Sequence, residues 1–98
     1  MVLTKVTPET QAIRHKNLPS QMRKTERRIA QSKERIAIYS QSQNQRMLSF
    51  WLGRLRVAER KLDELQQEFD GRRIAVKQGG RIFTVTVEEF AAASREEE

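Results

Sequence analysis

The residues best suited to chemistry in this sequence are basic, and they cluster in its first third. From Arg23 to Arg28 the chain reads Arg-Lys-Thr-Glu-Arg-Arg, so a helix there stacks Arg23 over Arg27 and Lys24 over Arg28. Such like-charge pairs each destabilise an isolated helix by roughly 0.2 to 0.5 kcal/mol. A polyanionic partner would recover that free energy, so the spacing favours a site for phosphate groups.

The charge of the whole chain follows the same pattern. Residues 1–35 hold nine Lys or Arg against three acids, whereas residues 36–98 hold ten of each. We therefore predict a nucleic acid partner, bound through its backbone with little sequence preference. The predicted nucleic-acid-binding residues are Arg14, Lys16, Arg23, Lys24, Arg27, Arg28, Lys33 and Arg35. A secondary nucleic-acid-binding site is predicted on one face of a β-hairpin, at Arg73, Lys77 and Arg81.

Residue patterns typical of catalysis or metal binding are missing from the sequence. There is no cysteine, which excludes disulfides, zinc–thiolate sites and thiol nucleophiles. The single histidine, His15, lies between two basic residues and is expected to be a polar surface residue. The acids Asp63, Glu64 and Glu68 lie near Arg60 and Lys61, so we interpret these acids as solvated ion-pair formers. We predict no enzymatic activity, no catalytic residue, no metal site and no cofactor.

Two stretches carry the seven-residue repeat of helices that pack against each other. The first repeat consists of Met22, Thr25, Ile29, Ser32, Ile36 and Tyr39. The second and more apolar repeat consists of Leu48, Trp51, Leu55, Ala58, Leu62, Leu65 and Phe69. The segment 40–45 between them is polar and uncharged, and we favour a turn there over one continuous helix with a shift of register. The sequence thus predicts an antiparallel helical hairpin.

The residues before this hairpin predict a separate element. Thr7-Pro8 is typical of a helix N-terminus, because the hydroxyl can cap the helix and proline fits its first turn. Pro19 disfavours helical backbone in the residue before it, which predicts a break. Residues 1–18 are therefore expected to form a short helix or an arm.

The last third alternates with the period of β-strands. Gly71 is expected to cap the preceding helix, and Gly79-Gly80 is expected to form a two-residue turn that pairs Val76 with Phe83. One face of this ribbon then carries Ile74, Val76, Phe83, Val85 and Val87. The other face carries Arg73, Ala75, Lys77, Ile82, Thr84 and Thr86. A short helical turn is expected from Glu88, and a solvated tail from Arg95.

Together these elements predict a mainly α fold with a small β-hairpin. We expect an antiparallel, coiled-coil-like helical hairpin, followed by a two-stranded β-ribbon and a short C-terminal helix. The predicted parts are an N-terminal arm or short helix (1–18), the helical hairpin (19–71), and the β-hairpin with a short helix and an acidic tail (72–98). No run approaches the roughly 18 apolar residues of a membrane span, and we expect a cytoplasmic protein.

The second helix is apolar beyond the stripe that one partner helix can cover. This surplus predicts self-association, most simply as a homodimer. The predicted oligomer interface consists of Met47, Leu48, Phe50, Trp51, Leu52 and Leu55.

Two functions fit these patterns. The favoured one is a small accessory protein that binds DNA or RNA through its first long helix and self-associates through its second. The alternative is a coiled-coil adaptor that recruits another protein by helix packing or strand addition and binds no nucleic acid. An anionic membrane is a poor partner, because Thr25 and Ser32 interrupt the apolar stripe of the first helix.

Overall fold

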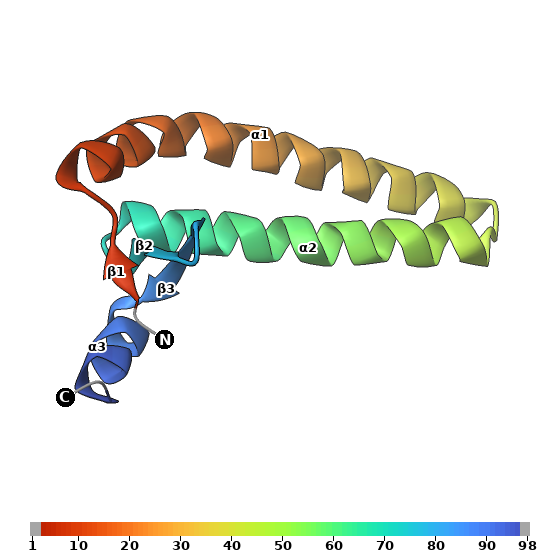
Figure 1. Cartoon of the computed structure of the whole chain (residues 1–98). Helices are drawn as coiled ribbons and strands as arrows, with labels where there is room; N and C mark the ends of the chain where they lie inside the picture. Colours follow the sequence, from red (N-terminus) through yellow and green to blue (C-terminus); the bar gives the residue numbers. More distant parts are fainter. Residues whose placement is uncertain (1–2, 97–98) are drawn as a thin grey trace. The chain divides into compact units, whose positions relative to one another are not determined.

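The computed structural model describes residues 3–96, and these form the predicted mainly α fold (Figure 1). The elements in chain order are β1 (Thr4–Lys5), α1 (Pro8–Gln41), α2 (Gln45–Phe69), β2 (Arg73–Gln78), β3 (Arg81–Thr86) and α3 (Val87–Glu96). The chain divides into two compact units. We call residues 20–63 the hairpin unit, and we call the described parts of 1–19 and 64–98 the sheet unit.

Helix α1 begins where the sequence predicts, but it does not break at Pro19. The backbone N–H of Thr10 donates to Thr7 Oγ1 at 3.2 Å, which caps the helix. The helix then continues through Pro19, although proline in a helix interior costs about 3 kcal/mol. Leu18 is only 1% exposed, and burying a leucine side chain contributes roughly 1.5 to 3 kcal/mol in the opposite direction. The predicted break is therefore wrong, because tertiary burial offsets a local preference.

The hairpin turns at residues 42–44, inside the segment predicted to turn. Gln43 has a φ of 57°, the left-handed conformation that commonly follows the end of a helix. Asn44 then caps α2, since the backbone N–H of Met47 donates to Asn44 Oδ1 at 3.2 Å. The turn is confirmed, and one continuous helix is excluded.

The two helices of the hairpin unit meet along a seam formed by both predicted repeats. Thr25 and Ser32 are each 3% exposed, at positions where a coiled coil usually has apolar residues. Their hydroxyls donate to the carbonyl oxygens of Gln21, at 2.9 Å, and Arg28, at 2.8 Å. These bonds remove the cost of burying an unpaired hydroxyl. The small side chain of Ala58 is also buried in this seam.

The sheet unit contains a three-stranded antiparallel sheet in the order β1-β2-β3. Val76 pairs with Phe83, as predicted, and Gly79 and Gly80 have φ values of 57° and 83°. A two-residue turn with both φ values positive matches the twist of the strands it joins, which fixes the register. β1 is an addition to the predicted ribbon, because Lys5 pairs with Val76 on the other side of β2.

A glycine C-cap ends α2 just before this sheet. Gly71 has a φ of 79°, and its N–H donates to the carbonyl of Glu68 at 3.1 Å. The N–H of Arg72 donates to the carbonyl of Gln67 at 2.8 Å, which completes a Schellman C-cap. The predicted glycine cap is confirmed.

Helix α3 is longer than the turn predicted for this region. Thr86 caps it, since the N–H of Glu89 donates to Thr86 Oγ1 at 3.1 Å. The helix includes Arg95, which was expected to lie in a solvated tail. Glu97 and Glu98, the rest of that tail, lie outside the described residues.

Candidate nucleic-acid interface

Six of the eight predicted nucleic-acid-binding residues lie on the α1 part of the hairpin unit, and all six are exposed. They are Arg23, Lys24, Arg27, Arg28, Lys33 and Arg35. Thr25 and Ser32 face α2 in the seam, so Arg23, Lys24 and Arg27 lie on the outer side of α1. Within residues 3–96, no carboxylate forms an ion pair with Arg23, Lys24, Arg27, Lys33 or Arg35. These cations are therefore open to an external anion.

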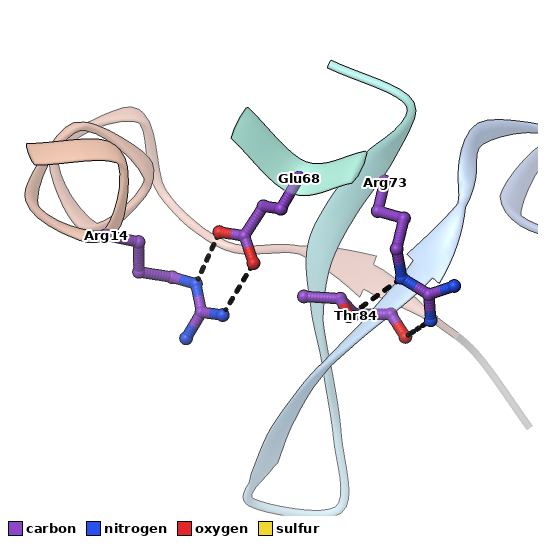
Figure 2. A network of polar contacts seen from close by, with 4 residues as sticks. All are labelled: Arg14, Glu68, Arg73 and Thr84. Carbon is purple, nitrogen blue, oxygen red and sulfur yellow. Dashed lines mark hydrogen bonds and ion pairs between the residues drawn. The ribbon is translucent and has the colours of Figure 1, made fainter. Parts of the chain in front are cut away.

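Arg14, another predicted nucleic-acid-binding residue, lies in the sheet unit and pairs with an acid of this chain. Its Nη2 lies 3.0 Å from Glu68 Oε1 and its Nε lies 3.3 Å from Oε2, a two-point ion pair shown in Figure 2. The Glu68 side chain is 2% exposed and the Arg14 side chain 32% exposed. Glu68 is thus buried and paired, which corrects its interpretation as a solvated surface acid. We omit Arg14 from the candidate interface, since its guanidinium neutralises this carboxylate.

The neighbours of Arg14 also make contacts that the sequence does not predict. His15 is exposed, as expected, and its ring stacks on Phe69 with centroids 5.1 Å apart and planes 8° apart. Phe69 ends the second predicted repeat, yet its side chain is exposed. Lys16, another predicted binding residue, is exposed in the sheet unit.

The secondary site on the β-hairpin is only partly open. Arg73 Nη2 donates to the carbonyl of Thr84 at 2.8 Å, and its Nε donates to Thr84 Oγ1 at 3.1 Å (Figure 2). These bonds tie β2 to β3 and occupy donors that a phosphate would need. Lys77 and Arg81 are exposed on the same sheet.

The residues predicted for an oligomer interface do not form one surface. Leu48, Trp51 and Leu55 are half-buried at seam positions of the hairpin unit, and Met47 is half-buried beside them. Phe50 and Leu52 are exposed, but two residues span about 200° around a helix, so they point in nearly opposite directions. The apolar surplus of α2 is therefore divided between two sides of the helix.

One of those sides borders a groove of about 530 Å³ within the hairpin unit. The lining residues are Thr25, Arg28, Gln31 and Ser32 from α1, and Phe50, Trp51, Gly53, Arg54, Val57, Ala58 and Lys61 from α2. Every charged residue in this lining is basic. The sequence contains a signal for this groove outside the two predicted repeats, because Phe50 and Val57, and likewise Arg54 and Lys61, are seven residues apart.

The aromatic residues of the groove hold one of its cations. The guanidinium carbon of Arg54 lies 5.6 Å from the ring centre of Phe50 and 5.7 Å from that of Trp51. The two rings meet edge to face, with centroids 5.4 Å apart. Such contacts hold the charged group against apolar surface. Trp51 Nε1 is buried and has no hydrogen-bond acceptor among the described residues.

Across the described ranges, no group of three or more His, Cys, Asp or Glu side chains is arranged to hold a metal ion. Over the same residues, no helix has both the length and the apolar character needed to cross a membrane. Comparisons of the chain with protein-family models, with curated proteins and with solved structures find no match.

Proposed function

We propose that this chain is a small, non-enzymatic accessory protein that binds the phosphate backbone of DNA or RNA through the outer side of α1. The observation that carries the proposal is the exposed stack of Arg23 over Arg27 and of Lys24 over Arg28. The folded chain keeps these like charges together, although each pair costs roughly 0.2 to 0.5 kcal/mol. A row of phosphates would turn that repulsion into attraction.

The length of the basic surface suits a polyanion. From Arg23 to Arg35 the helix rises about 18 Å, at about 1.5 Å per residue. Duplex DNA carries one charge per about 1.7 Å of its axis, so several phosphates lie within reach of these side chains at once. Because phosphate contacts carry no base information, we expect weak sequence preference.

Self-association is not part of this proposal. Leu48, Trp51 and Leu55 already lie in the seam of the hairpin unit, and the exposed Phe50 and Leu52 point in different directions. The homodimer expected from the apolar surplus of α2 stays a prediction.

Electrophoretic mobility shifts with duplex DNA, single-stranded DNA and structured RNA test the proposal. The test variant carries Arg23→Glu, Lys24→Glu and Arg27→Glu together. The matched control carries Arg46→Glu, Arg56→Glu and Arg60→Glu, three exposed residues of α2, so its net charge changes by the same amount. We expect binding by the wild type and by the control, and a loss of at least about tenfold in affinity only for the test variant.

Equal losses in the two variants would mean that net charge, not the α1 surface, drives binding. Absence of wild-type binding at about 0.1 M salt would reject the proposal.

A further inference from the structure

The groove of the hairpin unit is lined by a repeat that no other part of this unit covers. Along α2 its lining alternates apolar and basic side chains, as Phe50, Arg54, Val57 and Lys61. Phe50 is 50% exposed and Val57 is 69% exposed. An apolar side chain every seven residues is the repeat with which one helix contacts another. α2 uses one such row in the seam with α1, and this second row is free.

The charges of the groove indicate what would occupy it. Arg28 from α1 and Arg54 and Lys61 from α2 all line it, and no carboxylate does. A second copy that presented the same groove would bring like charges together, which disfavours a symmetric contact. A helix with an apolar stripe and acidic flanks would match both the row and the charges.

Gly53 provides an independent observation at the same place. It lies in the interior of α2 and lines the groove, and a Cβ built on it would meet no atom within 4 Å beyond its chain neighbours and the nearby backbone of its own helix. The chain's own packing therefore does not require a glycine there, although glycine costs a helix interior about 1 kcal/mol relative to alanine. A missing side chain does allow the backbone of a partner helix to approach closely.

We propose that this groove binds an acidic amphipathic helix of a partner protein. The apolar stripe of that helix contacts Phe50, Trp51 and Val57. Its acidic flanks pair with Arg28, Arg54 and Lys61. The lining of α2 extends from residue 50 to residue 61, about 16 Å of helix rise, which suits roughly three turns of a partner. Apart from Arg28, the groove shares no residue with the basic surface of α1. This proposal can therefore be tested separately from nucleic acid binding.

Two synthetic helical peptides of about three heptads test the proposal, each with leucine at the core positions. One peptide has glutamate at the flanking positions and the other has lysine. Trp51 is the only tryptophan of the chain, so its fluorescence reports on the groove directly. We expect the glutamate peptide to bind and to change the Trp51 emission, and the lysine peptide to do neither.

Two variants locate the contact. Val57→Glu puts a charge in the groove, and Leu52→Glu makes the same kind of change on α2 outside the lining. We expect Val57→Glu to weaken binding of the glutamate peptide by about tenfold or more, which is about 1.4 kcal/mol, and Leu52→Glu to leave it unchanged. Circular dichroism of both variants verifies that the helices remain folded.

Several results would overturn the proposal. Equal effects of Val57→Glu and Leu52→Glu would place the contact outside the groove. Equal binding of the two peptides, or no binding of the glutamate peptide, would show that the basic lining does not select an acidic helix. A wild-type dimer that Val57→Glu dissociates would identify a second copy as the occupant. A single-stranded oligothymidylate that quenches Trp51 would make the groove a nucleic acid subsite. In contrast, the variant with Arg23→Glu, Lys24→Glu and Arg27→Glu should lose oligonucleotide binding and keep peptide binding. That result would support the proposed function and would not contradict the groove proposal.

Discussion

Replacing Arg14 tests how much the ion pair between Arg14 and the buried carboxylate of Glu68 stabilises the sheet unit. Arg14→Met keeps most of the aliphatic length of the side chain but leaves Glu68, 2% exposed, without its partner. Breaking a buried ion pair from one side typically costs about 3 to 5 kcal/mol. Because the Arg14 side chain is 32% exposed, solvent screens the pair, and we expect about 2 to 3 kcal/mol.

The double variant Arg14→Met, Glu68→Leu removes both charges and should recover most of that loss. Replacing a buried pair with apolar side chains of similar volume is often neutral or stabilising. We expect its stability to lie within about 1 kcal/mol of the wild type, so the two substitutions should be strongly non-additive.

Urea denaturation followed by circular dichroism at 222 nm measures these differences, as shifts of midpoint at constant slope. If Arg14→Met costs less than about 0.5 kcal/mol, the pair behaves as an exposed one. Arg14 would then be available to an external anion, and our reason for omitting it from the interface would be wrong.

Three other substitutions test separate parts of the structure. Gly53→Ala should stabilise the chain by up to about 1 kcal/mol in urea titrations and weaken binding of the glutamate peptide, whereas a loss of stability would show that the glycine serves the fold. Gly80→Ala forces a side chain into a φ of 83° and should cost at least about 1 kcal/mol, so an unchanged urea midpoint would contradict the assigned turn. Asn44→Ala removes the cap of α2 and should cost about 1 kcal/mol, while Asn44→Ser should restore most of it, and equal stability of all three proteins would refute the capping role.

The parts of the fold that the sequence predicts are those specified by local chemistry. The seven-residue repeats identify the seam, and the polar segment before Met47 identifies the turn. Two adjacent glycines specify the turn that pairs Val76 with Phe83, because glycine readily adopts the positive φ values of a two-residue hairpin turn. Each of these signals lies within a few residues of the element that it determines.

The predictions that failed depend on contacts between distant residues. Pro19 carries a local signal to stop a helix, and the burial of Leu18 outweighs it. Glu68 was predicted to be solvated from the residues around it, but its partner Arg14 is 54 residues away in the sequence. The groove was missed for a different reason. Its second row of side chains is visible in the sequence, but only the fold shows which side of α2 is left open.

The dependence of binding on salt tests the central claim most directly, namely that the outer cations of α1 contact phosphates. The logarithm of the association constant for duplex DNA, plotted against the logarithm of salt concentration, falls with a slope of about −0.9 per neutralised phosphate. Replacing Arg23, Lys24 and Arg27 with glutamate should therefore make the slope shallower by about 2.7. A variant that binds with the wild-type slope would show that these residues contact no phosphate.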